Sequence, residues 1–173
     1  MVSRIILITG GARSGKSRLA EQLAEGYGAP LGYIATATSG DGEMAERIAR
    51  HQARRGKEWQ TIEEPHDLSG AISRNAPLYR ALLVDCVTLW LTNLLLMHHD
   101  PEPVLGYVNS LTETITGLNT PLVLVTNEVG MGIVPENRLA REFRDLAGMA
   151  NQLLAEIADE VYVTYCGLPL RLK

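Results

Sequence analysis

The chain has 173 residues, of which 46% are hydrophobic and 21% charged, so we expect one globular domain over residues 1–173 with a substantial core. Its net charge of −4 argues against a nucleic-acid partner. No apolar stretch is long enough for a membrane span and no signal peptide is visible, so the sequence predicts a cytoplasmic protein.

The N-terminal part predicts a strand, a glycine loop and a helix in succession. Residues 5–8 form an apolar run typical of a buried strand, and residues 17–25 have helical spacing. Between them lies Gly-x-x-x-x-Gly-Lys-Ser, the pattern of a phosphate loop. We call the following residues the phosphate loop: Gly10, Gly11, Ala12, Arg13, Ser14, Gly15, Lys16 and Ser17.

This pattern predicts a nucleoside triphosphate site. Glycines let successive backbone N–H groups point at phosphate oxygens, and the N-terminus of the following helix favours negative charge. Lys16 can reach the terminal phosphates, and the Ser17 hydroxyl can bind Mg²⁺.

Further along, short strands and helices alternate. The pattern predicts strands at 31–37, 59–62, 82–85, 122–125 and 161–165, and helices at 43–55, 68–73, 87–97 and 104–118. A last, long helix is expected to have Pro135 in its first turn. Its apolar face is expected to comprise Leu139, Phe143, Leu146, Ala150, Leu153 and Ile157. Cys86 and Cys166 lie in or beside apolar runs and are expected to be buried free thiols.

This alternation predicts an α/β fold, with a mostly parallel sheet covered by helices on both faces. Ligands of such sheets bind at the carboxyl ends of the strands. The loops after Ile8, Ala37, Val84 and Val125 should therefore meet at one edge.

Three further features could carry chemistry. Asp85 ends an apolar strand, where an acid can hold Mg²⁺ opposite a phosphate loop or serve only as a turn former. His51 has arginines around it on the predicted helix, which would keep its imidazole neutral and nucleophilic, although a solvated basic helix face explains the same pattern. The pair Asn127-Glu128 could orient a substrate or a water, or could belong to a simple glycine-containing loop.

Several motifs together resemble the bifunctional adenosylcobinamide kinase/adenosylcobinamide-phosphate guanylyltransferase family of cobalamin biosynthesis. The resemblance spans nearly the whole chain. Its markers are the run from Thr9 through the phosphate loop, Tyr33-Ile34-Ala35-Thr36, the segment from Glu43 to Ile48 that leads to His51, the run from Val125 to Pro135, and Glu136-Asn137-Arg138.

The resemblance implies a RecA-like phosphate-loop NTPase fold and two activities. The enzyme would phosphorylate adenosylcobinamide with ATP or GTP, and would then transfer GMP from GTP to adenosylcobinamide phosphate through a covalent adduct on His51. Lys16 would be the second catalytic residue, and Mg²⁺, held by Ser17 and Asp85, the cofactor. The resemblance also implies a homo-oligomer, with a trimer expected.

By family motif, the nucleotide contacts extend beyond the phosphate loop. They are Ala35, Thr36, Ala37, Gln52, Ala53, Arg54, Arg55, Glu63 and Asp85. Two other functions remain open at this point: a one-step small-molecule kinase in which His51 is inert, and a RecA-like module that acts on a macromolecule.

Overall fold

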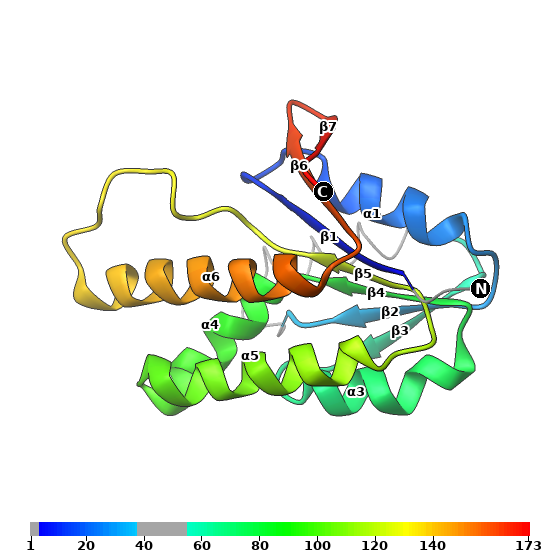
Figure 1. The fold of residues 1–173 in the computed structure, drawn as a ribbon, viewed down its shortest axis with the longest axis horizontal. Helices are drawn as coiled ribbons and strands as arrows, with labels where there is room; N and C mark the ends of the chain where they lie inside the picture. Colours follow the sequence, from blue (N-terminus) through cyan, green and yellow to red (C-terminus); the bar gives the residue numbers. More distant parts are fainter. Residues whose placement is uncertain (1–3, 38–54) are drawn as a thin grey trace.

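The computed structural model of the protein describes residues 4–37 and 55–173, and these residues build a seven-stranded sheet between helices (Figure 1). The strands are β1 (Ile5–Gly10), β2 (Leu31–Ala35), β3 (Trp59–Glu63), β4 (Ala81–Asp85), β5 (Leu122–Val125), β6 (Glu160–Tyr165) and β7 (Leu168–Arg171). The helices are α1 (Lys16–Glu25), α3 (Leu68–Asn75), the short 3-10 helix η1 (Ala76–Leu78), α4 (Val87–His98), α5 (Pro101–Thr116) and α6 (Arg138–Ile157).

The strand order is β3-β2-β4-β5-β1-β6-β7. Strand β1, which leads into the phosphate loop, therefore lies between β5 and β6, two strands that are distant from it in sequence. Strands β1 to β6 are mutually parallel, and only β7 runs antiparallel to its neighbour β6. The carboxyl ends of β1, β2, β4 and β5 therefore lie at one edge, which we call the carboxyl rim.

Alternation of side chains along the strands divides the core into two layers. On β1, Ile5 and Leu7 pack toward α3, α4, α5 and α6, while Ile6 and Ile8 pack toward α1. Figure 1 shows α1 on one side of the sheet and the other helices on the opposite side. The expected sheet with helices on both faces is confirmed.

The helix starts differ from the sequence expectation because side-chain caps decide them. The last helix begins at Arg138 rather than at Pro135, because the Asn137 side chain accepts a hydrogen bond from the Ala140 N–H. Helix α5 begins at Pro101, earlier than predicted, where Asp100 caps the first turn. The apolar face of α6 is as expected at Leu146 and Ala150, but Leu139 is exposed because it lies in the first turn, away from the core.

Strand β7 is absent from the sequence prediction. It pairs with β6 through the two-residue turn Cys166-Gly167, in which both residues have positive φ, of 52° and 81°. This is the geometry of a tight hairpin turn of type I′, which Gly permits at its second position. We call residues 160–171 the C-terminal hairpin. The turn leaves Cys166 exposed, so the expectation of a buried thiol there is wrong, although both cysteines are free.

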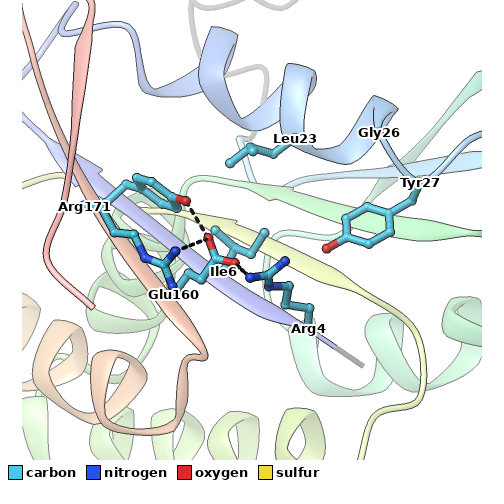
Figure 2. Close-up of a pocket in the computed structure, with 8 residues that line it drawn as sticks. Arg4, Ile6, Leu23, Gly26, Tyr27, Glu160 and Arg171 are labelled. Carbon is cyan, nitrogen blue, oxygen red and sulfur yellow. Dashed lines mark hydrogen bonds and ion pairs between the residues drawn. The ribbon is translucent and has the colours of Figure 1, made fainter. Parts of the chain in front are cut away.

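A buried carboxylate anchors the C-terminal hairpin to β1. Glu160 on β6 is only 4% exposed and forms an ion pair with Arg4, while Arg171 of β7 lies 3.9 Å from its second oxygen (Figure 2). The Tyr162 hydroxyl donates to that same oxygen at 2.5 Å. Partners on both sides compensate the burial of the charge, and they join β1, β6 and β7.

No helix among the described residues is both long and apolar enough to cross a membrane.

Candidate functional site at the carboxyl rim

The phosphate loop connects β1 to α1 in a conformation that depends on particular backbone angles. Gly10 and Gly15 have φ of 146° and 103°, values that L side chains rarely adopt, and Arg13 is left-handed with φ 56°. Gly11, Ala12 and Arg13 are exposed, so a ligand can reach the backbone of this part of the loop. The loop leads directly into the N-terminus of α1, which favours an anion.

Lys16 lies across the loop rather than in solvent. The residue is 8% exposed, and Nζ donates to the carbonyl oxygens of Gly10 at 3.0 Å and Gly11 at 2.6 Å. The ammonium group is therefore held over the mouth of the loop, where a triphosphate oxygen could replace a carbonyl as its partner.

Asp85 ends β4 beside the start of α1, as the strand order requires. The Ser17 hydroxyl donates to Asp85 Oδ2 at 3.5 Å, and the Tyr33 hydroxyl donates to the same oxygen at 2.5 Å. Burial and the neighbouring Asp85 carboxylate raise the pKa of Tyr33, so its hydroxyl keeps its proton and remains a donor.

Ser17 and Asp85 together fit a Mg²⁺ site of the kind found beside phosphate loops. A hydroxyl and a carboxylate are oxygen ligands that Mg²⁺ accepts, and the nucleotide and water supply the remaining ligands in such sites. Within residues 4–37 and 55–173, no three His, Cys, Asp or Glu side chains are grouped to hold a metal by themselves. The two protein oxygens suit a cation whose remaining ligands come from a nucleotide and water.

The segment after β2 brings Ala35, Thr36 and Ala37 to the same rim. Ala35 lies opposite Asp85 on one side and Glu63 on the other. Thr36 is fully buried, and its hydroxyl lies within hydrogen-bond distance of the carbonyl oxygens of Asp85 and Cys86. Its side chain thus ties β2 to β4, and Ala35 and Ala37, both half-buried, are the members of this segment that a ligand can reach.

Arg55, the first residue that the structure describes after Ala37, lies close to this site. Its guanidinium stacks over the Tyr33 ring, 3.3 Å from the ring centroid. Arg55 itself lies in a bend, and the rest of the helix predicted for 43–55 lies outside the described residues. The predicted site residues His51, Gln52, Ala53 and Arg54 lie outside the described residues.

The Asn127-Glu128 pair lies directly beside the phosphate loop. The Glu128 N–H donates to the Gly10 carbonyl at 3.1 Å, which continues the pairing of β5 with β1 beyond the strands. The Asn127 N–H donates to the Thr88 hydroxyl at 2.7 Å, and Asn151 of α6 donates to the Asn127 carbonyl at 3.2 Å. These contacts fix the position of the pair at the rim.

Some residues of the rim were not singled out by sequence reasoning. Tyr33 appears in the family motif, but no spacing rule connects it to Asp85. Thr88, Thr126 and Asn151 form a hydrogen-bonded group behind Asn127, and buried polar residues after strands are a weak sequence signal. Thr164 and Gly167 contact the phosphate loop from the far end of the chain.

A cavity of about 450 Å³ lies elsewhere, on the α1 face of the sheet. Figure 2 shows that Arg4, Tyr27 and Glu160 are among its lining residues. Arg4 precedes β1, whereas the phosphate loop follows it, so this cavity lies at the opposite edge from the carboxyl rim.

The sequence matches one protein family over nearly its whole length. The family model described as cobinamide kinase / cobinamide phosphate guanyltransferase matches residues 6–172. The bifunctional adenosylcobalamin biosynthesis protein CobP of Pseudomonas aeruginosa is 51% identical, with 96% of each chain covered. Proteins of the same description named CobU are 42% identical in Escherichia coli and 44% identical in Salmonella typhimurium, with 98% of this chain and 99% of each relative covered.

Solved structures with lower sequence identity share the fold. A KaiC-like protein from Pyrococcus horikoshii has a TM-score of 0.51 at 16% identity, covering 92% of this chain and 70% of that one. The RadB recombinase has a TM-score of 0.55 at 12% identity, covering 92% and 73%. These likenesses agree with the expected RecA-like phosphate-loop NTPase fold.

Proposed function

The chain belongs to the cobinamide kinase / cobinamide phosphate guanyltransferase family, and from this premise we propose that it phosphorylates adenosylcobinamide and then converts the product to adenosylcobinamide-GDP. It is a bifunctional transferase of cobalamin biosynthesis, as its relatives' names indicate. The observation that carries the proposal is that Lys16, Ser17 and Asp85 lie together at the carboxyl rim of a chain that the family model matches over residues 6–172.

In the kinase step, a hydroxyl oxygen of adenosylcobinamide attacks the γ-phosphorus of ATP or GTP. The bond from that phosphorus to the β–γ bridging oxygen breaks, the nucleoside diphosphate leaves, and the hydroxyl proton is released. The N–H groups of the phosphate loop and the Lys16 ammonium stabilise the charge on the phosphate oxygens. Mg²⁺ held by Ser17 and Asp85 would neutralise further charge on the bound triphosphate.

In the guanylyl step, a ring nitrogen of His51 attacks the α-phosphorus of GTP. The bond to the α–β bridging oxygen breaks and pyrophosphate leaves. A phosphate oxygen of adenosylcobinamide phosphate then attacks the same phosphorus, the phosphorus–nitrogen bond breaks, and His51 is regenerated. The position of His51 in the family motif supports this role, and so does the cluster Arg47, Arg50, Arg54 and Arg55 in the sequence around it.

The nucleotide site we propose consists of the phosphate loop, Ala35 to Ala37, Gln52 to Arg55, Glu63 and Asp85. The register of β2 between β3 and β4 supports this site, because Ala35 pairs with Glu63 on one side and with Asp85 on the other. Arg55 stacked on Tyr33 adds a positive charge near Asp85.

We also propose a homotrimer. Large apolar side chains are exposed in the segment that leaves β5, including Met131 (75%) and Ile133 (98%), and on β7, including Leu168 (72%). Figure 1 shows that the segment after β5 extends well away from the sheet before α6 begins. Exposed apolar groups of this kind are typical of surfaces that a partner covers. Light scattering should give three times the chain mass of 18.9 kDa.

Labelled GTP tests the two-step chemistry. The protein and Mg²⁺ are incubated with GTP labelled at either the α- or the γ-phosphate, and an acid-labile adduct is sought on wild type and His51→Ala. We expect α-label on wild type, none on the variant, and no γ-label on either. A wild type that transfers γ-label to adenosylcobinamide but never retains α-label would instead be a one-step kinase, and DNA-stimulated hydrolysis without transfer would indicate a macromolecule-binding module.

A further inference from the structure

The turn of the C-terminal hairpin contacts the middle of the phosphate loop. The Gly167 N–H donates to the Ser14 carbonyl at 2.9 Å. The Thr164 and Ser14 hydroxyls are hydrogen-bonded at 2.7 Å, and both side chains are buried. The two segments are 150 residues apart in sequence, so only the tertiary structure brings them together.

Two glycines of the phosphate loop allow this close approach. A Cβ on Gly10 would lie 2.7 Å from the Thr164 carbonyl oxygen, and a Cβ on Gly15 would lie 3.0 Å from Gly167 Cα. Real Cβ atoms essentially never make a contact as short as the first distance, and the second is tighter than nine in ten such contacts. These glycines thus serve two purposes, the turn of the loop itself and its packing against the hairpin.

The hydrogen bond at Ser14 determines which way one peptide group of the loop faces. In a planar trans peptide the C=O and the following N–H point in opposite directions. Because the Ser14 carbonyl points at the hairpin, the Gly15 N–H points away from it. A phosphate loop binds its ligand through such N–H groups, so fixing this peptide prepares a donor for an anion.

The hairpin is itself held firmly at its other end. Glu160 connects it to Arg4 of the segment before β1 and to Arg171 of β7, as Figure 2 shows. The hairpin is therefore attached to the sheet near β1 at one end and to the phosphate loop at the other. A rigid contact of this kind lowers the conformational entropy that ligand binding must remove.

We infer that Thr164 and Gly167 are positioning residues of the nucleotide site, which hold the Ser14-Gly15 part of the phosphate loop in the conformation that accepts the nucleotide's phosphates. The inference rests on the proposed nucleotide-binding function of this loop. Neither residue needs to touch the nucleotide, since each acts through Ser14 and Gly15.

Substitution of Thr164 tests the inference. Thr164→Val keeps the shape of the side chain but removes its hydroxyl, while Thr164→Ser keeps the hydroxyl. Thr120→Val is the matched control, because the Thr120 hydroxyl donates to the Ala76 carbonyl at 2.7 Å, near the amino-terminal end of β5. For each protein, the Kd of MgGTP is measured by calorimetry, together with kcat and the KM for the nucleotide in the kinase reaction, and the thermal unfolding midpoint.

We expect Thr164→Val to raise the Kd and KM for the nucleotide about ten-fold, a change equivalent to ~1.4 kcal/mol, with kcat at saturation changed less than about two-fold. Thr164→Ser should restore binding to within about two-fold of wild type. An unchanged Kd in Thr164→Val, or an equal loss of MgGTP affinity in Thr120→Val, would overturn the inference. The proposed function would still stand in that case, provided that the wild type binds MgGTP. A wild type that does not bind MgGTP at all would overturn both.

A second pair of variants covers the case in which Thr164→Val does not fold. Gly167 is exposed and a Cβ added there would meet nothing within 4 Å, so substitution there changes the turn and not the core. Both Gly167→Asn and Gly167→Val retain the backbone N–H. Asn tolerates the positive φ of this position, whereas the β-branched Val disfavours it. We expect weaker MgGTP binding in Gly167→Val than in Gly167→Asn, and equal binding would contradict the inference.

Discussion

The Tyr33 hydroxyl on β2 lies 2.5 Å from Asp85 Oδ2 at the end of β4, so a buried phenol orients the carboxylate proposed to bind Mg²⁺. Burial, followed by the Asp85 charge, raises the pKa of this phenol. The aromatic ring also contacts the Arg55 guanidinium. One side chain thus links the acid proposed to bind Mg²⁺ to the segment that follows His51.

Removal of the Tyr33 hydroxyl should raise the Mg²⁺ requirement. In Tyr33→Phe the Asp85 carboxylate loses the hydroxyl that donates to Oδ2 and is less well oriented toward the cation. We expect the Mg²⁺ concentration for half-maximal kinase activity to rise about five- to ten-fold, in line with the net contribution of about 1 kcal/mol that a typical hydrogen bond makes. Titration of activity with Mg²⁺ at saturating nucleotide measures this, and an unchanged midpoint would show that the hydroxyl does not orient Asp85.

Tyr33 should also make stability fall at alkaline pH. A tyrosine whose pKa is raised on folding stays protonated in the folded protein, while the unfolded chain loses the proton above its ordinary pKa of about 10. Its contribution is fully present below that pH and decreases above it, by about 1.4 kcal/mol per pH unit. Urea unfolding from pH 9 to 11 should show a shallower decline for Tyr33→Phe than for wild type, and parallel curves would contradict this assignment.

Lys16 should be required for both reactions, because the phosphate loop is proposed to bind the triphosphate in each of them. Lys16→Met removes the charge held over the loop, and we expect both the kinase and the guanylyl rates to fall about 10²- to 10³-fold. Lys173→Met is a matched control, since its Nζ contacts carbonyl groups at the end of α6. A variant that lost only one of the two activities would indicate separate nucleotide sites.

Thr88 should matter for stability, because its hydroxyl accepts the Asn127 N–H and lies 3.2 Å from the Thr126 hydroxyl. Thr88→Val leaves the Asn127 N–H without this acceptor in a half-buried position. We expect the free energy of unfolding to fall by about 1–3 kcal/mol, the cost of a buried unsatisfied donor. Thr116→Val, at an exposed position of α5, is the control for urea denaturation and should change stability by less than about 0.5 kcal/mol.

The two glycines at the start of the phosphate loop should respond differently to alanine. Gly10→Ala places a Cβ against Thr164 at a φ of 146°, whereas Gly11→Ala meets nothing within 4 Å. We expect Gly10→Ala to lower the free energy of unfolding by more than about 2 kcal/mol, as overpacking does, and Gly11→Ala to change it by less than about 1 kcal/mol. Similar unfolding midpoints for the two variants would show that the hairpin yields to the new side chain.

Local pattern was sufficient to predict the phosphate loop and the fold class. Consecutive residues predict the strand, the glycine loop and the helix around Lys16. Continuous apolar runs predict the buried strands of a parallel sheet. The meeting of Asp85 with Ser17 was also predictable, because parallel strands place their carboxyl ends at one edge.

The tertiary structure alone decided the contacts that connect distant segments through polar side chains. A hydroxyl such as that of Tyr33, Thr88 or Thr164 has no period or spacing that identifies its partner, since the partner depends on strand order and register. Strand β7 was missed for a related reason: its residues are exposed, and the turn Cys166-Gly167 differs from the usual Asn-Gly or Asp-Gly signal. The sequence by itself thus determined the place of the phosphate loop between strand and helix, because that signal lies in consecutive residues. The packing of β4, β2 and the C-terminal hairpin around that loop determined how its residues are held, because those contacts depend on strand order and register.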